Sequence, residues 1–300
     1  MKQRTKGLIA AMVSSATFGM IPLFSKPALD AGMDTPSLIV YRFLFASIVI
    51  YAVMKYYKCD LMITMSHFWR ISLLALINLA SAITILLGYA YLTSGAATTI
   101  QFSYPIFTCL LMMLFFHERP TFKTVSSIIL AVIGVALLSG IENGLGNMSV
   151  KGVAYELFSG LAYAIYLILV PKMKLDDLES SKLTFWVFVL SFVYMGLITF
   201  AWKGSITTPP TVGVGFSIVM LGLIPTAVSN LTLVVGLRVI GSTLTSILGA
   251  LEPLTAMLVS IFWFCEPFSW IMGVGFICIV VSVTLLILPS NSAQDTAKVS

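Results

Sequence analysis

Charged side chains are scarce in this chain of 300 residues. Only 10% of the residues are Asp, Glu, Lys or Arg, whereas 59% are apolar and the mean hydropathy is +1.02. A soluble protein needs roughly a quarter of its residues charged to cover its surface. The chain is therefore predicted to lie largely in lipid. About ten spans of ~20 residues would leave only short loops and tails, with no room for a separate soluble domain.

Several signatures of catalytic, metal and nucleic-acid sites are also missing. The four cysteines are scattered without a CxxC or Cys/His spacing, so neither a disulfide framework nor a zinc site is expected. The two histidines have no partners at metal-ligand spacing. The sequence has no phosphate-binding GxxxxGK[ST] loop, no GxSxG elbow with a His partner in the membrane and no dense basic run. We therefore expect no cofactor, no metal, no nucleic-acid partner and no direct use of ATP.

Long apolar runs, separated by short polar breaks, fill most of the chain. They cover residues 7–27, 36–54, 69–91, 96–116, 121–141, 150–171, 183–202, 213–236, 241–264 and 268–288. Each run has the length of a membrane-spanning helix, and none alternates like a strand of a membrane barrel. The sequence predicts an all-α polytopic membrane protein with ten transmembrane helices.

The positions of Lys and Arg predict the orientation. With the amino terminus inside, about thirteen of the 17 basic residues fall in cytoplasmic tails and loops. About three (Lys26, Lys151 and Lys203) fall outside, and Arg42 lies within a span. Basic residues accumulate on the cytoplasmic side of membrane proteins. Both termini are therefore predicted to be cytoplasmic, and the first apolar run is read as a retained span rather than a cleaved signal.

The sequence repeats itself. Tyr104-Pro105 precedes Glu118 by the same spacing with which Glu252-Pro253 precedes Glu266, and residues 7–18 more weakly parallel residues 152–163. Each copy holds five spans, an odd number, so the second copy must be inverted relative to the first. We predict two five-helix repeats, residues 1–146 and 147–300, the second with a short cytoplasmic tail. Inverted repeats are typical of secondary transporters, which bind substrate near the midplane between the repeats.

With ten spans, two five-helix halves and the paired Pro…Glu motif, the chain resembles the EamA family of the drug/metabolite transporter superfamily over roughly residues 7–288. The resemblance implies an inner-membrane carrier, often an exporter of amino acids or related metabolites. It also implies a central cavity walled by helices 1–4 and 6–9, with helices 5 and 10 at the periphery.

Three ionisable residues lie deep within predicted spans, where each costs about 2.5–3.5 kcal/mol on insertion scales and invites a functional interpretation. Glu252 and Glu156 could take and release a proton during transport. Arg42 could bind a substrate carboxylate with two hydrogen bonds. The alternative is an internal ion pair of Arg42 with Glu156 or Glu252 that fixes helix packing. Glu118 and Glu266, at helix ends, are expected to cap the helices that follow them.

Four prolines lie inside predicted spans and are candidate hinges. Proline removes the backbone bond to the carbonyl four residues earlier, which frees the carbonyls of Phe18, Gln101, Leu221 and Gly249. These carbonyls could contact substrate, mark bending points or simply kink helices for packing. The candidate hinges are Pro22, Pro105, Pro225 and Pro253.

Polar and aromatic side chains gather on a subset of the spans. Glu156, Ser159 and Tyr163 share one helical face, because their spacing is i, i+3, i+7. The alternative to substrate binding is hydrogen bonding between helices, worth typically ~0.6 kcal/mol per contact. Together with the three ionisable residues, the candidate substrate-binding residues are Asn78, Gln101, Tyr104, Ser159, Tyr163 and Asn230.

These features predict a secondary active transporter that works by alternating access and exports small polar metabolites such as amino acids. Its partners would be that metabolite, the lipid bilayer and, if transport is coupled, protons; it would act as a monomer or a homodimer. Two alternatives stay open: an uncoupled facilitator, and a membrane-embedded enzyme such as a lipid-modifying transferase. A receptor or pore is a third. An enzyme would need its polar groups at one membrane face, whereas here they fall near mid-depth.

Overall fold

A computed structural model of the chain describes residues 2–89, 91–92, 100–138, 149–264 and 269–287. All of its regular elements in these ranges are helices. They are α1 (Lys2–Phe18), α2 (Ile21–Asp30), α3 (Thr35–Tyr56), α4 (Met65–Tyr89), α6 (Tyr104–Phe116), α7 (Phe122–Leu138), α8 (Val150–Lys172), α9 (Ser180–Lys203), α10 (Val212–Gly222), the π-helix η2 (Leu223–Val228), α11 (Ser229–Leu248), α12 (Leu251–Phe264) and α13 (Trp270–Ile287).

The helices account for the predicted spans. Six stretches are long and apolar enough to cross a membrane, and the shorter apolar helices α6, α7, α12 and α13 supply the remaining predicted spans. The first stretch, Gln3–Asp30, contains α1 and α2, and Val212–Leu248 contains α10, η2 and α11. The boundary between the predicted repeats, at residues 146 and 147, lies outside the described residues. This is a multi-pass helical membrane protein.

The eighth and ninth predicted spans join without a loop. They meet inside α11, where Gly241 has φ 82° and ψ 171° and breaks the helix. A residue with a side chain would be strained at this positive φ, so glycine is the residue that allows the sharp change of direction. The segment 242–248 therefore leads towards α12 instead of extending the helix before it.

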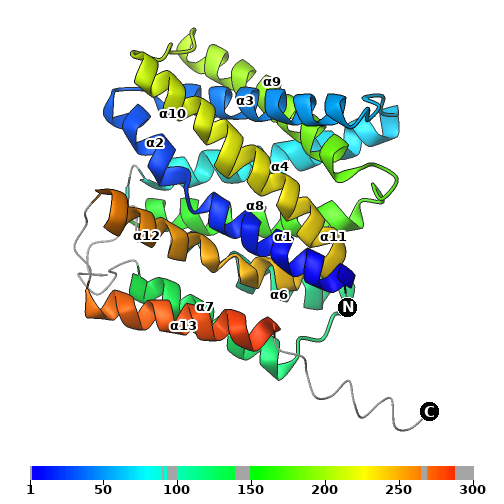
Figure 1. Cartoon of the computed structure of the whole chain (residues 1–300), viewed down its shortest axis with the longest axis vertical. Coiled ribbons are helices and arrows are strands. Elements are labelled where there is room, and N and C mark those ends of the chain that lie inside the picture. Colours follow the sequence, from blue (N-terminus) through cyan, green and yellow to red (C-terminus); the bar gives the residue numbers. More distant parts are fainter. Residues whose placement is uncertain (1, 90, 93–99, 139–148, 265–268, 288–300) are drawn as a thin grey trace.

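The bundle is held together by helix pairs that join the first half of the chain to the second. α1 packs along α11, α4 along α8, α3 along α9 and α7 along α13 (Figure 1). α7 and α13 form one edge of the bundle, which agrees with the peripheral place expected for the fifth and tenth spans. The end of α13 and the start of α1 lie on the same side of the bundle.

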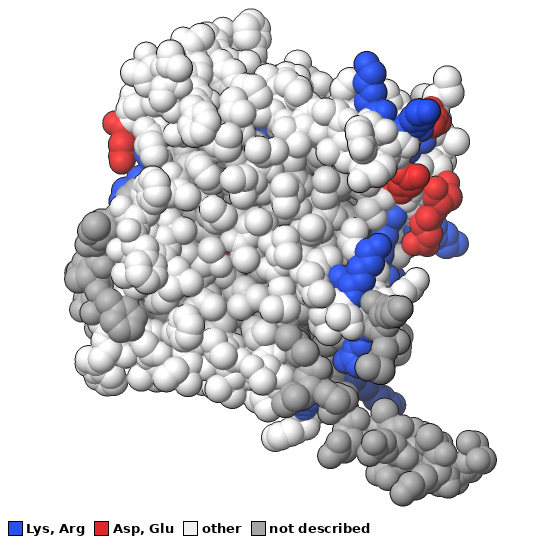
Figure 2. All heavy atoms as spheres, viewed as in Figure 1, with Lys and Arg blue, Asp and Glu red and all other residues white. Residues whose placement is uncertain are grey.

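Charge is distributed as a bilayer requires. Figure 2 shows Lys and Arg gathered along the edge of the molecule where α1 begins, while the broad middle of this face carries almost no charged residues. The exposed side chains of the helices are largely apolar, and they include Leu114, Leu197, Phe216 and Phe262. Large exposed apolar surfaces mark membrane or protein contacts, and on helices long enough to cross a bilayer they indicate lipid.

Small residues let two of the helix pairs approach closely. In the α1–α11 seam, a Cβ on Gly236 would lie 3.2 Å from the Cβ of Ala11, and Ser229 Oγ donates to the Ser14 carbonyl at 3.0 Å. In the α4–α8 seam, Gly88 faces Glu156. There Ser159 Oγ donates to the Ser81 carbonyl at 2.9 Å, and Ser81 Oγ donates to the Ser159 carbonyl at 3.0 Å. Glycine and serine are common where helices meet in membranes, since they combine close packing with satisfied polar groups.

Polar clusters tie the loops at the two ends of the bundle. Where α3 begins, Asp34 accepts hydrogen bonds from Ser37 and Thr207 and pairs with Lys203 at 2.8 Å. At the opposite end, Arg70 of α4 donates to the Met173 and Lys174 carbonyls. From α11, Arg238 donates to the carbonyls of Leu175 and Leu178, so both arginines hold the connection between α8 and α9.

The Asp34 cluster gives a prediction about stability. Burial alone would raise the pKa of Asp34, but the bonds from Lys203, Thr207 and Ser37 outweigh it and lower the pKa well below its ordinary value of 3.8. The ionised carboxylate therefore stabilises the fold above pH 3.8, and this contribution is lost as the pH falls further. We expect Asp34→Asn to lower the free energy of unfolding at pH 7 by about 1 kcal/mol.

The measurement is the thermal unfolding midpoint of the detergent-solubilised protein between pH 3 and pH 7. The difference in unfolding midpoint between wild type and Asp34→Asn should become smaller towards pH 3. Asp30→Asn, an exposed carboxylate at the end of α2, is the matched control and should leave the midpoint unchanged. Identical midpoints for wild type and Asp34→Asn at pH 7 would contradict the prediction.

Candidate functional site

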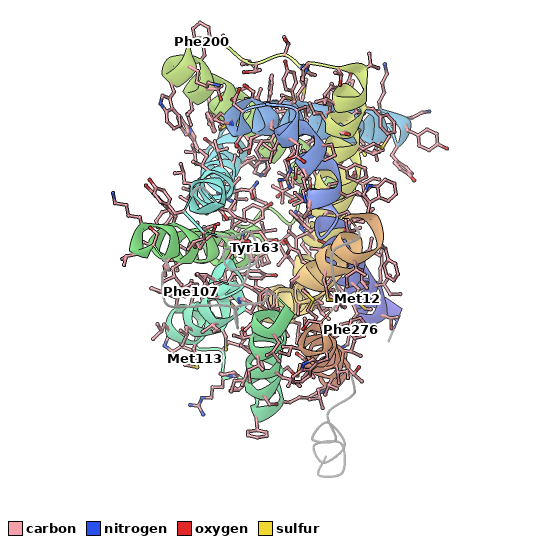
Figure 3. The ribbon with its side chains drawn as sticks, turned by 90° about the vertical axis from the view of Figure 1, so that its left-hand side faces the viewer. Met12, Phe107, Met113, Tyr163, Phe200 and Phe276 are labelled. Carbon is pink, nitrogen blue, oxygen red and sulfur yellow. The ribbon has the colours of Figure 1, made fainter. Side chains whose placement is uncertain are left out.

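A small polar cavity lies inside the bundle, and Figure 3 shows Tyr163, one of its lining residues, near the middle of the molecule. Its volume is about 10 Å³, room for about one water molecule. Residues of α1, α6, α8, α11 and α12 surround it, together with the Gly249 turn. The lining residues are Ser14, Ser15, Phe18, Tyr104, Tyr163, Leu167, Leu233, Thr245, Ser246, Gly249 and Glu252. Neither α7 nor α13 contributes to this lining.

Aromatic rings form one wall of the cavity. Tyr104 and Tyr163 meet edge to face, with ring centroids 4.9 Å apart, and Tyr163 stacks on Tyr166 at 6.3 Å. The hydroxyl of Tyr104 occupies the space beside Gly249, where a Cβ would overlap it. This glycine therefore determines how deeply the Tyr104 ring can enter the site.

Glu252 is the carboxylate of the cavity. It lies in the first turn of α12, where the positive end of the helix dipole favours a negative charge. Its side chain is partly exposed to the cavity and interacts electrostatically with Arg42, Tyr104 and Tyr163. Gly19 packs directly on the Glu252 backbone, which brings the end of α1 and Phe18 beside the same carboxylate.

Arg42 reaches the site region from α3. Its Nε donates to Thr226 Oγ1 at 2.7 Å, and its guanidinium carbon lies 5.9 Å from the centre of the Phe18 ring, within cation–π range. Thr226 Oγ1 in turn donates to the Leu221 carbonyl, also at 2.7 Å. Pro225 cannot donate to that carbonyl, so the threonine replaces the missing backbone bond. These hydrogen bonds, from Arg42 to Thr226 and from Thr226 to Leu221, thus hold the guanidinium near the cavity.

Three of the four predicted hinge prolines start a helix rather than kink one. Pro22 and Pro105 stand in the first turns of α2 and α6, and Pro253 in the first turn of α12. A proline costs little there, since the first N–H groups of a helix have no partner within it. Pro225 lies in the π-helix η2. The expectation of free carbonyls is wrong for Leu221, as described above, and for Gly249, whose carbonyl accepts from the Glu252 N–H at 2.9 Å.

Other candidate residues lie away from the cavity. Glu156 and Ser159 belong to the α4–α8 seam, so the face that they share with Tyr163 is divided between helix packing and the cavity. The buried Asn230 donates through Nδ2 to the Thr226 carbonyl in the preceding η2. Gln101 packs through its carbonyl beside Gly160, and Asn78 lies half-buried on α4; neither lines the cavity.

The expected cap of α7 is supplied by a different residue. Thr121 Oγ1 accepts the hydrogen bond from the Thr124 N–H, whereas the exposed Glu118 accepts a bond from Thr243 Oγ1 at 3.3 Å. A short hydroxyl directly before a helix reaches its first N–H groups more easily than a carboxylate further upstream. Glu266, the equivalent residue, lies outside the described residues.

Several lining residues were not singled out from the sequence. Leu167, Leu233 and Thr245 are apolar or small and lack a recognisable chemical signal. The weak parallel between residues 7–18 and 152–163 aligns Phe18 with Tyr163, and both residues line the cavity.

Discontinuous helices that enclose a polar cavity in a membrane are an architecture of transporters. Comparison with known proteins agrees: the model of the EamA-like transporter family matches residues 5–140 and 150–288. The chain therefore belongs to the EamA-like transporter family.

Relatives found by sequence comparison are also transporters by name. The uncharacterized transporter YcxC of Bacillus subtilis (strain 168) is 26% identical over 292 residues, which cover 94% of this chain and 92% of that protein. An uncharacterized transporter of Archaeoglobus fulgidus is 38% identical over 80 residues, 27% of this chain and 28% of its own. A crystal structure with 12% sequence identity has a TM-score of 0.82 and covers 95% of this chain and 98% of its own, which shows a shared fold.

The contact between Gly249 and Tyr104 gives a second prediction. Gly249→Ala would place a methyl group where the Tyr104 hydroxyl lies, and displacing the ring should cost about 1–3 kcal/mol of stability. Gly215→Ala in α10 is the control, because nothing lies within 4 Å of its Cβ position. The thermal unfolding midpoint should fall for Gly249→Ala only. A variant as stable as Gly215→Ala would show that the Tyr104 ring is not confined by this contact.

Proposed function

We propose that the protein is a secondary transporter that moves a small polar metabolite, most simply an amino acid, out of the cell by alternating access. The observation that carries the proposal is the cavity itself. It lies inside the bundle between helices of both halves of the chain, and a carboxylate, hydroxyls and aromatic rings line it. Polar groups in such a position are costly unless a substrate or water uses them.

The helix contacts support an inverted repeat as the basis of the alternation. Exchanging each helix of the first half for its counterpart in the second turns the α1–α11 pair into the α8–α4 pair, and leaves the α3–α9 and α7–α13 pairs unchanged. The match extends to single residues. The sequence offset that aligns residues 7–18 with 152–163 relates Ser14 to Ser159, and the offset that aligns Pro105 with Pro253 relates Ser81 to Ser229. Both resulting serine pairs are hydrogen-bonded.

Charges near the cavity favour a zwitterionic substrate. Glu252, with Phe18, Tyr104 and Tyr163 beside it, can hold an ammonium group through ionic and cation–π attraction. Arg42 interacts electrostatically with Glu252 and Tyr163 and can hold a carboxylate in its bidentate geometry. The hydroxyls of Ser14, Thr245 and Ser246 line the same cavity. Thr245 and Ser246 donate to carbonyls of their own helix, and their oxygens can still accept a hydrogen bond from a polar substrate group.

The cavity volume supports movement during the cycle. Ligand pockets usually measure about 300–1,000 Å³, and the present cavity of about 10 Å³ is far smaller. Substrate entry therefore requires the helices that line it to separate. The starts of α2, α6 and α12 at breaks beside the cavity provide points of bending, and the polar clusters at Asp34 and at Arg238 close the two ends.

Protonation of Glu252 or Glu156 would couple this movement to the proton gradient; without such coupling the protein is a facilitator.

Substrate flux tests the proposal. Cells overproducing the wild type are screened for resistance to toxic amino-acid analogues, and the amino acids found are then measured as radiolabelled tracers in proteoliposomes. Loss of one charged hydrogen bond costs about 1.5–3 kcal/mol, so Glu252→Gln should reduce tracer flux at least tenfold. Glu118→Gln removes an exposed carboxylate outside the cavity and should transport like the wild type. No flux in any arm, or equal flux with Glu252→Gln, would overturn the proposal.

The proposed orientation places both termini in the cytoplasm of the plasma (inner) membrane. Alkaline phosphatase fused to either terminus should be inactive, whereas green fluorescent protein in the same positions should fluoresce. A phosphatase inserted between α9 and α10 at Ser205, on the opposite side, is the matched positive control. Active phosphatase at either terminus would reject this orientation.

A further inference from the structure

An acidic residue distinguishes the α4–α8 seam from the equivalent α1–α11 seam. Gly7 packs on Val239 and Ile240 in the α1–α11 seam, as the equivalent Gly152 packs on Tyr91 and Leu92 in the α4–α8 seam. The serine pairs correspond in the same way, as described above. Between the glycine contact and the serine pair of each seam lies one further contact. In the α1–α11 seam Gly236 faces Ala11, but in the α4–α8 seam the equivalent Gly88 faces Glu156. An acidic side chain thus occupies a place that a methyl group fills in the other seam.

Glu156 is not explained by packing. Its side chain is fully buried, with 0% of its surface exposed, and neither carboxyl oxygen has a hydrogen-bond partner in the described part of the chain. The carboxyl group fills the space that the missing side chain of Gly88 leaves. An ionised carboxylate without partners in such a place is very costly, whereas the neutral acid is tolerated. In this arrangement Glu156 therefore carries a proton.

We propose that Glu156 is a proton-binding site separate from the substrate cavity, loaded when the α4–α8 seam is closed and emptied when the seam opens to water. The reaction is the reversible binding of one proton from water to the carboxylate, with no other group consumed. Glu252 remains available to the substrate. This assignment rests on the proposed alternating access, because only a moving bundle opens the seam.

The surroundings of Glu156 allow it to act alone. α4, α6 and α11 pack against α8, and the main titratable groups that the structure describes on these elements lie at the ends of the seam or at the cavity. Tyr91 and Tyr155 pair at the outer end of the seam, and Tyr104, Tyr163 and Tyr166 lie at or beside the cavity. Lys151 is exposed at the start of α8, while His67, Arg70 and Arg238 hold the far end of the helix.

Linkage fixes the direction of the pH effect. The closed seam binds the proton and the open seam releases it, so acid favours the closed seam and alkali favours its opening. The α1–α11 seam has Ala11 in place of Glu156 and provides an internal control in the same molecule. Its opening should not depend on this proton.

Hydrogen exchange of the purified protein in detergent measures the two seams without a substrate. After correction for the intrinsic pH dependence of exchange, wild-type amides at 80–89 and 150–159 should gain protection as the pH falls from 9 to 6. Amides at 7–15 and 229–240 should not. Glu156→Gln keeps the shape and removes the titration, so protection of the α4–α8 seam should become independent of pH. Potentiometric titration of the same samples should show one proton fewer for this variant.

Glu156→Ala, which copies the Ala11 arrangement, guards against a failure to fold and should give the same result as Glu156→Gln. If both folded variants keep the wild-type exchange profile and proton count, Glu156 is a permanently neutral packing group and the inference is overturned. Neither readout uses transport, so such a failure would leave the tracer experiment with Glu252→Gln as the independent test of the carrier. Conversely, absence of flux with intact proton linkage would reject the carrier and with it the coupling role given to Glu156.

Discussion

Close approach of helices across the α1–α11 and α4–α8 seams is the contact on which the rest of the structure depends. Lipid supplies no hydrophobic force between helices, so small residues and hydrogen bonds must provide the attraction. Gly88 and Gly236 remove side chains at the crossing, and the buried serine pairs bond hydroxyls to backbone carbonyls. Because each seam joins one helix from each half of the chain, neither half can bury its polar groups without the other.

The cavity is a consequence of this interlocking combined with broken helices. α2, α6 and α12 begin inside the bundle, and their first turns carry proline at no cost to hydrogen bonding. Non-ideal backbone at this depth is tolerated in membranes only where protein or water covers it. The Thr226 hydroxyl donates to the Leu221 carbonyl, to which Pro225 cannot donate, and it accepts a hydrogen bond from Arg42 at the same time. Backbone repair and placement of a charged group are therefore the same interaction.

Much of the fold was accessible from the sequence, because the bilayer demands long apolar helices with a recognisable length. The apolar stretches and the peripheral place of α7 and α13 could be predicted. Glu252, Tyr104 and Tyr163 were candidate residues from the sequence, and the structure places them at the cavity. Residues such as Thr245 and Leu167 could not, since hydroxyls and leucines occur on every span and only packing shows which of them face a cavity. The helix breaks at the prolines were also misjudged, because proline in a first turn and proline in a kink have the same sequence.

The sequence by itself determined that the chain is a membrane protein and which segments are apolar enough to cross the bilayer. It also determined which few ionisable residues lie deep within those segments. Each of these properties depends on the composition along a single helix. Only the tertiary structure decided that Glu252 faces the cavity while Glu156 is buried against a glycine in a closely packed helix seam. Both are carboxylates in apolar helices, and what differs is the neighbour that another segment, distant in sequence, brings beside them. That choice of neighbours arises from the packing of the whole bundle, which no local pattern encodes.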